Sequence, residues 1–193
     1  MKKLLNNTYY LFRHGQSETN TKRIINGDPS SGLYSFGLTE EGKEQVKEVA
    51  KEYKDNSIFA QDSIIFTSDF LRTRQTADII AEIIRGNHVY TTEKLRERSF
   101  GDFENKSKDN LKSIWESDMR NNTERFMHVE TTQEVFDRVD AFINELEEKY
   151  TNKTIILVSH GDILQILLTG WHAHSPSEHR NLLSIKNAEV RKL

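Results

Sequence analysis

The residues of this sequence best suited to chemistry are two histidines that each follow an apolar run and precede a glycine. The segment Arg13-His14-Gly15 follows the run 9–12, and His160-Gly161 follows the run 154–159. A strand that ends in this way places an imidazole at the carboxyl edge of a sheet, where open α/β folds bind ligands. The glycine lets the backbone approach whatever is bound there.

Two further charged segments contribute polar groups near the ends of apolar runs. Segment 67–77 follows the run 63–67 and contains Arg72, and segment 95–101 contains Glu97. Planar guanidinium groups form paired hydrogen bonds with phosphate-like anions. Two histidines and two arginines at strand ends could therefore surround a tetrahedral dianion.

The order of apolar runs along the chain indicates the fold that would bring these groups together. Strand-like runs occupy residues 9–12, 63–67, 88–91 and 154–159, and a last strand is expected within 182–193. Segments with helical spacing of apolar residues lie between them. Strands that alternate with helices predict a three-layer α/β/α fold with a mostly parallel central sheet.

Four helices are predicted from apolar stripes, and one segment has no clear period. The stripes pass through Val46 and Ala50, through Ala77 and Ile80, through Val139 and Phe142, and along residues 163–168. Thr131 with Glu134 resembles a capping box at the start of the third helix. Residues 105–130 are polar and poorly periodic, so we expect a helical or irregular excursion over the site within a single domain of residues 1–193.

Composition narrows the classes of partner. The chain has 193 residues, a formal net charge of −3 and no cysteine, and its mean hydropathy is −0.71. A net negative chain lacks the basic surface of a general nucleic-acid binder, whereas local Arg and His clusters still allow an anionic small molecule. The absence of cysteine excludes disulfides and thiolate chemistry. Neither an apolar leader nor a membrane span is evident, so a cytoplasmic protein is expected.

The four polar segments, in this order, resemble the histidine phosphatase superfamily, also called the phosphoglycerate-mutase-like family. The similarity runs from Tyr9 to about Leu193 and includes two linking segments, Leu38-Thr39-Glu40-Glu41-Gly42 and Asn187-Ala188-Glu189-Val190. The second of these resembles the closing strand of the phosphatase branch. Asp162 and Gln165 depart from the pattern, since many relatives carry a small residue and an arginine there.

The resemblance implies a role for each residue of the phosphate site. His14 would be the nucleophile and would become phosphohistidine, which suits an imidazole that is partly unprotonated near neutral pH. Arg13 and Arg72 would clamp the non-bridging oxygens of the phosphate. His160 would donate to the same oxygens as charge develops on the transferring group.

Other residues would complete the substrate site. Asn20 fits a neutral donor, and the backbone of Gly161 would present an N–H at a helix start. Gln16 and Ser17 would line the mouth of the pocket, and Arg23 and Arg98 are candidate substrate contacts. For Arg98, a position facing water is an equally good interpretation.

Glu97 would protonate the leaving alcohol and then activate water for the second half-reaction. The first task requires a raised pKa, which a desolvated site beside a phosphate dianion would provide. Asp102 and Glu104 are alternatives to Glu97 in this charged stretch, just as Arg74 is an alternative to Arg72. No metal and no other cofactor is expected, because arginine and histidine supply the positive charge.

The expected activity is that of a metal-independent phosphomonoesterase, a hydrolase of the histidine acid phosphatase type, acting on a small phosphorylated substrate. The nearest alternative is a cofactor-dependent phosphoglycerate mutase. Such mutases usually carry a longer insertion between the positions of Glu97 and His160 and a tail after the last strand, and this chain shows neither. A catalytically idle module that binds phosphorylated ligands is a third hypothesis. The sequence leaves the substrate and the oligomeric state open.

Overall fold

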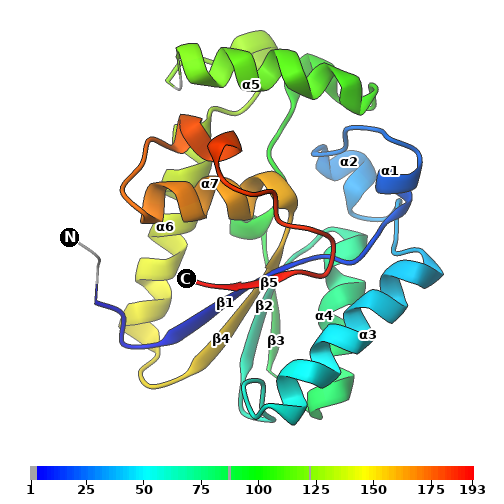
Figure 1. Cartoon of the computed structure of the whole chain (residues 1–193), viewed down its shortest axis with the longest axis vertical. Coiled ribbons are helices and arrows are strands. Elements are labelled where there is room, and N and C mark those ends of the chain that lie inside the picture. Colours follow the sequence, from blue (N-terminus) through cyan, green and yellow to red (C-terminus); the bar gives the residue numbers. More distant parts are fainter. Residues whose placement is uncertain (1–3, 87, 122) are drawn as a thin grey trace.

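A single mixed sheet forms the centre of the computed structural model, which describes residues 4–86, 88–121 and 123–193 (Figure 1). Residues 1–3 and residue 122 lie outside the described residues. Residues 1–3 belong to the N-terminal segment in which no apolar leader is expected, and residue 122 belongs to the segment 105–130. The sheet order is β3-β2-β4-β1-β5, in which only β5 runs antiparallel, alongside β1. The strands of this sheet are β1 Thr8–Arg13, β2 Ile64–Ser68, β3 Val89–Thr92, β4 Thr154–Ser159 and β5 Val190–Lys192.

Helices cover both faces of the sheet, which confirms the predicted three-layer α/β/α architecture. The α-helices are α1 Glu18–Thr21, α2 Pro29–Gly32, α3 Glu40–Asp55, α4 Leu71–Ile84, α5 Leu111–Arg120, α6 Thr132–Lys149 and α7 Gly161–Trp171. Short 3-10 turns are η1 Glu93–Leu95, η2 Gly101–Phe103, η3 Lys108–Asn110, η4 Phe126–His128 and η5 Pro176–Asn181. The four stripes predicted from the sequence lie on α3, α4, α6 and α7.

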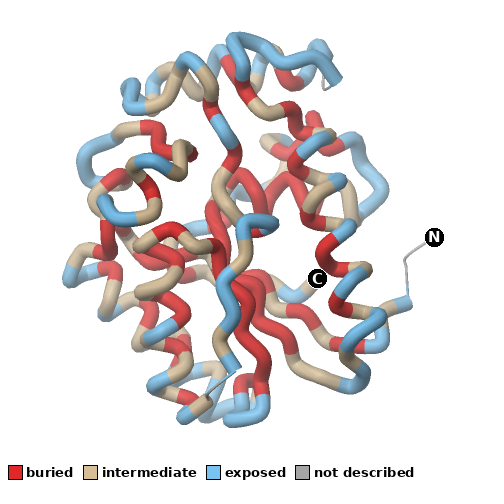
Figure 2. The backbone as a smooth tube through the Cα atoms, turned by 180° about the vertical axis from the view of Figure 1, so that it is seen from behind, coloured by how far each residue is buried: buried red, intermediate tan, exposed pale blue. Residues whose placement is uncertain are grey.

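The central strand β4 explains why the sheet needs helices on both sides. Ile155 and Leu157 pack in a core with α6 and α7, while Ile156 and Val158 pack in a second core with α3 and α4. Alternate side chains of a strand point to opposite faces. A strand that is apolar at all four of these positions is therefore stable only between two layers. Figure 2 shows the central strands buried.

Helix starts follow from local side-chain chemistry. Thr131 accepts a hydrogen bond from the backbone N–H of Glu134 at 3.1 Å, and a carboxylate oxygen of Glu134 accepts from the N–H of Thr131 at 2.8 Å. This reciprocal pair is a capping box, as the sequence predicts for the start of α6. In α3, the Thr39 hydroxyl accepts from the N–H of Gly42 in the same manner.

The chain between η2 and α6 forms a cover above the carboxyl ends of the parallel strands (Figure 1). It contains η3, α5 and η4 and packs through a small apolar cluster of Ile25, Phe100, Ile114 and Val129. These four residues come from distant parts of the sequence, so the cover is held by tertiary contacts rather than by its own pattern. None of the helices that the structure describes is both long and apolar enough to cross a membrane.

Candidate active site

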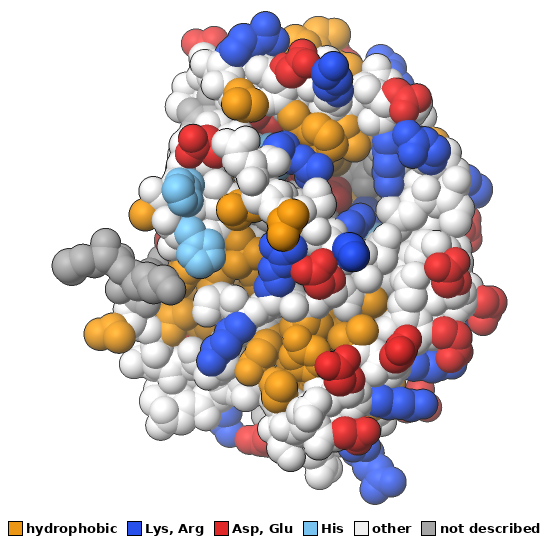
Figure 3. Space-filling view, in the orientation of Figure 1, with side chains coloured by type: hydrophobic (Ala, Val, Ile, Leu, Met, Phe, Trp, Pro, Cys, Tyr) orange, Lys and Arg blue, Asp and Glu red, His pale blue; other side chains and the backbone are white. Residues whose placement is uncertain are grey.

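A cavity of about 210 Å3 lies where the parallel strands end beneath α5. On the face drawn in Figure 3, Lys and Arg side chains gather around a hollow below α5. Six of the residues predicted from the sequence line this cavity, namely Arg13, His14, Asn20, Arg72, Glu97 and Gly161. The cavity therefore brings together groups contributed by β1, the starts of α4 and α7, and the segment after η1.

His14 follows the last residue of β1 and is buried in the floor of the site. Its Nδ1 lies 2.7 Å from the carbonyl oxygen of Gly15, an acceptor, so Nδ1 carries the proton. Burial, together with the nearby Arg72 and Arg13 charges, holds the pKa of His14 well below its usual range. The ring is thus neutral, and Nε2 keeps its lone pair.

Gly15 is required where the backbone turns away from β1. A Cβ atom at this position would lie 2.3 Å from the carbonyl oxygen of Gly42 in α3. Any larger residue would push β1 and α3 apart and would move the neighbouring His14. The glycine that follows the histidine in the sequence is therefore explained by close backbone packing.

His160 lies beside His14, with the two ring centroids 5.3 Å apart. Arg72 Nε donates to His160 Nδ1 at 3.2 Å, so the His160 proton is on Nε2, which lies 3.0 Å from Ser68 Oγ. Burial and the adjacent Arg72 charge hold the pKa of His160 well below its usual range. This second histidine is neutral, and its orientation is fixed from both ring nitrogens.

The Arg72 side chain is 2% exposed and lines the cavity from the first turn of α4. Its Nη1 and Nη2 donate to the side-chain and backbone oxygens of Asn26, both at 2.9 Å. Burial lowers the pKa of Arg72 to about 10. Asn26 was not singled out in the sequence; it too lines the cavity and fixes the plane of the guanidinium.

Arg13 provides the second guanidinium of the floor. Its Nη1 donates to the carbonyl oxygen of Ile185 at 2.6 Å, whereas its buried Nε has no hydrogen-bond partner among the described residues. Burial lowers the pKa of Arg13 as well. Two cations thus flank the neutral imidazole of His14, and such an arrangement favours an anion over a neutral ligand.

Within the charged stretch 95–104, Glu97 carries the carboxyl group that lines the cavity. Burial, and then the negative charge of Asp162, raise its pKa to about 7. The alternatives lie elsewhere: Glu104 accepts backbone hydrogen bonds from Gly27 and Phe100, and Asp102 contacts His128 at the surface. A carboxyl group with a pKa near 7 is suited to both giving and taking a proton at neutral pH.

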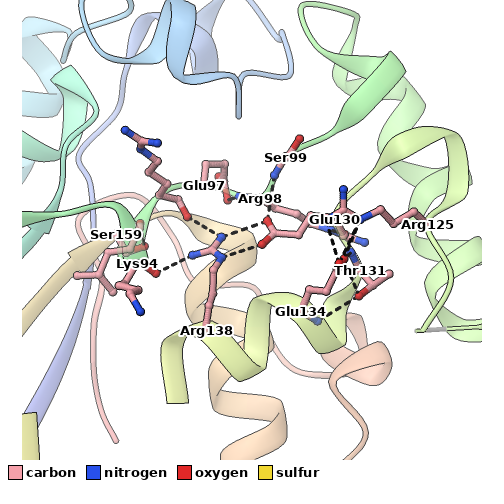
Figure 4. A network of polar contacts seen from close by, with 12 residues as sticks. Lys94, Glu97, Arg98, Ser99, Arg125, Glu130, Thr131, Glu134, Arg138 and Ser159 are labelled. Carbon is pink, nitrogen blue, oxygen red and sulfur yellow. Dashed lines mark hydrogen bonds and ion pairs between the residues drawn. The ribbon is translucent and has the colours of Figure 1, made fainter. Parts of the chain in front are cut away.

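The segment that carries Glu97 is held from below by α6 (Figure 4). Arg138 Nη1 donates to the carbonyl oxygen of Lys94 at 2.6 Å, and Arg138 Nη2 donates to that of Arg96 at 3.0 Å. Arg138 Nε also donates to a Glu130 carboxylate oxygen at 2.8 Å. Ser159 Oγ, at the end of β4, donates to the Leu95 carbonyl oxygen at 2.8 Å. These bonds fix the backbone that leads into Glu97.

Asn20 and Gly161 also lie at the cavity, as the sequence predicts. The Asn20 side-chain oxygen accepts from the Ser17 N–H at 3.0 Å and from the Ser17 hydroxyl at 2.9 Å. The oxygen is therefore occupied, and the amide N–H₂ is the end left to donate. Gly161 is the first residue of α7, where backbone N–H groups are unpaired within the helix.

Five predicted site residues do not line the cavity in the part of the chain that the structure describes: His160, which lies buried behind Arg72 with its Nε2 on Ser68, and four predicted substrate contacts. Ser17 caps α1, and the Gln16 side chain accepts from the Thr39 hydroxyl at 2.8 Å. Arg23 is exposed and pairs with Asp109 at 2.8 Å. Arg98 is buried and forms a two-fold ion pair with Asp118 of α5, at 2.5 and 2.7 Å.

Several cavity residues were not predicted as site residues. Lys108 and Trp115 come from the cover, Asp162 and Gln165 from α7, and Arg180 from η5. Burial lowers the pKa of Lys108 to about 8. Asp162, directly after His160-Gly161, and Gln165 had a sequence signal, because both depart from the family pattern. The others depend on how α5 and η5 fold back over the strand ends.

The described residues contain no group of three or more His, Asp or Glu side chains that could hold a metal ion. Arg13, Arg72, Lys108 and Arg180 are the cationic side chains among the residues that line the cavity.

Comparison with known proteins agrees with this geometry. Residues 9–193 match the histidine phosphatase superfamily (branch 1). A protein named probable phosphoglycerate mutase GpmB, from Escherichia coli O1:K1, is 33% identical over 165 residues, which is 83% of this chain and 72% of that protein.

Two solved structures share the fold. One is a mycobacterial glucosyl-3-phosphoglycerate phosphatase with VO3, with a TM-score of 0.79 and 21% identity over 96% of this chain and 92% of that chain. The other is a phosphoserine phosphatase from Entamoeba histolytica in complex with 3-phosphoglyceric acid, with a TM-score of 0.77 and 22% identity over 96% and 89%. The resemblance predicted from the sequence is confirmed: this chain is an enzyme of the histidine phosphatase superfamily, branch 1.

Proposed function

We propose that this enzyme is a metal-independent phosphomonoesterase that forms a phosphohistidine on His14. The observation that carries the proposal is the neutral His14 ring, whose proton lies on Nδ1 and whose Nε2 is a free base beside two guanidiniums. A neutral imidazole is a competent nucleophile toward phosphorus, and a cationic one is not. Glu97, with a pKa of about 7, provides the proton that the leaving group needs.

The first half-reaction transfers the phosphoryl group from the ester to the protein. His14 Nε2 forms a bond to phosphorus while the ester P–O bond breaks. The Glu97 proton moves to the departing oxygen, so the alcohol leaves as a neutral molecule. Without that proton an alkoxide would have to leave, which is the costly step for an alkyl ester.

The second half-reaction restores the enzyme. Glu97, now a carboxylate, takes a proton from water, and the water oxygen forms a bond to phosphorus as the P–N bond breaks. Inorganic phosphate leaves, and His14 returns to its neutral form. One group thus serves as acid and then as base, which suits a pKa close to the working pH.

Arg13 and Arg72 oppose the charge on the transferring group. Guanidiniums already fixed by the Ile185 carbonyl and by Asn26 lose little freedom when the anion binds. His160 accepts a hydrogen bond from Arg72 Nε through its Nδ1 and so positions that guanidinium, while its Nε2 faces Ser68. The charge that a phosphate dianion requires is then supplied by the chain itself.

A phosphoglycerate mutase is the second candidate, because a relative with 33% identity carries the name probable phosphoglycerate mutase. Such an enzyme would use the same histidine but would pass the phosphoryl group to a second hydroxyl instead of water. The two solved structures of similar fold are named as phosphatases. Hydrolysis is the simpler outcome when water reaches the phosphohistidine.

A panel of small phosphate esters, assayed for released phosphate and without added metal, tests the proposal. We expect turnover with p-nitrophenyl phosphate and with at least one alkyl phosphate. A parallel reaction with 3-phosphoglycerate and 2,3-bisphosphoglycerate tests the mutase, whose product is 2-phosphoglycerate. Isomerisation faster than phosphate release would favour the mutase, and ligand binding without turnover in either reaction would favour an idle binding module.

A further inference from the structure

Asp162, the second residue of α7, is a second acidic side chain in the lining of the cavity, and the phosphoryl transfer described above does not use it. The side chain is 9% exposed, and its buried Oδ2 accepts no hydrogen bond from the residues that the structure describes. A negative charge in a phosphate cavity disfavours the anion. The residue is therefore unexpected at this place unless its charge acts on another group.

Arg98 contacts both acids of the cavity, Glu97 and Asp162. Its backbone N–H donates to Glu97 Oε1 at 3.1 Å, so the proton of the neutral acid lies on Oε2. Its Nη1 lies 3.8 Å from Asp162 Oδ2. A single arginine thus spans the two carboxyl groups, which line the same cavity of about 210 Å3. Charges this close in a largely buried site interact more strongly than they would in water.

The charge of Asp162 persists because Arg98 is engaged elsewhere. Arg98 Nη1 and Nη2 donate to the two Asp118 carboxylate oxygens at 2.7 and 2.5 Å, and Arg98 Nε donates to the Glu130 carbonyl oxygen at 2.6 Å. The same Nη1 remains beyond hydrogen-bond distance of Asp162. Arg180 Nη1 lies 3.6 Å from Asp162 Oδ1, but its side chain is partly exposed to solvent, so it offsets the charge only in part.

The cations around Glu97 oppose its protonation. Burial raises the pKa of Glu97 most and the negative charge of Asp162 raises it further, whereas Arg72 of α4 and Arg13 of β1 lower it. Lys108 of η3 also faces Glu97 and acts in the same direction as the two arginines. Without the charge of Asp162, these three cations would draw the proton off Glu97 at a lower pH.

We propose that Asp162 is a positioning residue for the acid step: its negative charge, left unbalanced because Asp118 engages Arg98, keeps the proton on Glu97 at neutral pH. In this role Asp162 acts through Glu97 and needs no contact with the substrate. Asp118 belongs to α5, so the contact between the cover and Arg98 sets the strength of the acid. This inference rests on the proposed phosphomonoesterase function.

The experiment follows kcat/KM against pH for n-propyl phosphate, which needs the acid, and for p-nitrophenyl phosphate, which does not. The quantity compared is the ratio of the two, because a change in phosphate binding affects both esters alike. The wild type is compared with Asp162→Asn and Asp162→Ala, which remove the same charge but differ in shape, and with Asp118→Asn. Asp102→Asn is the matched control, because that exposed carboxylate contacts His128 and is not among the residues that line the cavity.

In the wild type the ratio should fall above the Glu97 pKa of about 7. In Asp162→Asn and Asp162→Ala the fall should begin at least about half a pH unit lower, by the same amount in both, which is about a threefold lower ratio on the alkaline side. Asp118→Asn should move the fall in the same direction, because Arg98 is then free to pair with Asp162. Asp102→Asn should leave it in place.

A fall at the wild-type pH in the neutral Asp162 variants would overturn the assignment. Unequal shifts in Asp162→Asn and Asp162→Ala would also contradict it, because a charge effect does not depend on the shape of the replacement. If one of these variants does not fold, the other gives the same test, and an unshifted Asp118→Asn counts against the part assigned to Arg98. A wild-type ratio that does not change with pH would instead remove Glu97 from the acid role. Absence of turnover of both esters by the wild type would refute the phosphomonoesterase function itself.

Discussion

Replacing Glu97 by Gln keeps the size of the side chain and removes its acidic proton, so it tests the acid role with little change in packing. With a pKa of about 7, roughly half of the Glu97 side chains are protonated at pH 7. A carboxyl group at the ordinary value of 4.5 would be protonated in only about 0.3% of molecules at that pH. The buried position thus provides roughly 150 times more acid than an exposed glutamate would.

The loss should depend on the leaving group. General acid catalysis contributes about 10² to 10⁴ in rate, so Glu97→Gln should lower kcat/KM for an alkyl phosphate by at least about a hundredfold. p-Nitrophenolate leaves without protonation, so its ester should lose less than about tenfold. Glu104→Gln is the matched control, because that half-buried carboxylate accepts from backbone N–H groups and is not among the residues that line the cavity.

The pH dependence gives a second readout of the same group. The first step needs the protonated acid, so kcat/KM for the alkyl ester should fall about tenfold per pH unit above the Glu97 pKa of about 7. This descending limb should be absent in Glu97→Gln and weak for p-nitrophenyl phosphate in the wild type. Equal losses on the two esters, with an unchanged alkaline limb, would remove Glu97 from the acid role.

Three further substitutions test individual contacts. Arg72→Lys removes the forked contact with Asn26, so kcat/KM should fall more than about tenfold, or about 1.4 kcal/mol of barrier. The control Arg74→Lys should change kcat/KM little, because Arg74 binds the Leu33 carbonyl oxygen. Equal losses of kcat/KM in the two variants would contradict the role of Arg72. Asp118→Asn breaks the buried ion pair with Arg98, so the free energy of unfolding, measured by urea denaturation, should drop by about 3–5 kcal/mol. A drop below about 1 kcal/mol would show that this ion pair does not hold the cover in place. Thr131→Ala removes the N-cap of α6, so the free energy of unfolding should fall by about 1 kcal/mol in the same assay while kcat/KM stays unchanged. A large fall in kcat/KM would contradict a purely structural role for Thr131.

The layered fold was predictable because each strand and long helix carries its own signal. β4 is apolar from Ile155 to Val158, and α6 has both a stripe and a capping box, so their places follow from local sequence. α5 offers much less, since Ile114 and Asp118 are its buried residues among those described. Its stability depends on partners such as Arg98 and Phe100, and a pattern within the segment does not reveal them.

The candidate site was predictable to the extent that its residues follow strand ends. His14, Arg13 and Arg72 lie at the starts of loops or helices that leave the sheet, so topology alone brings them together. Arg98 shows the limit of this reasoning. The string Leu-Arg-Glu-Arg does not indicate which side chains turn inward, and the burial of Arg98 is determined by Asp118, which approaches from the cover.

Two of the cavity residues, Arg180 and Trp115, were missed for a related reason. Arg180 and Trp115 meet only after η5 and α5 fold back over the strand ends, and each alone resembles an ordinary surface or packing residue. Asp162 stood out as a departure from the family pattern, but its unpaired oxygen is a property of the folded chain.

The central claim is a covalent bond between His14 and the transferred phosphoryl group, and rapid-quench trapping tests it most directly. Wild-type enzyme exposed briefly to a radiolabelled phosphate ester should carry label that is lost in acid and stable in alkali, as expected for a phosphoramidate. The label should map to the peptide containing His14 and be absent from His14→Ala. Turnover by the wild type without such label, or equal label on His14→Ala, would contradict the account.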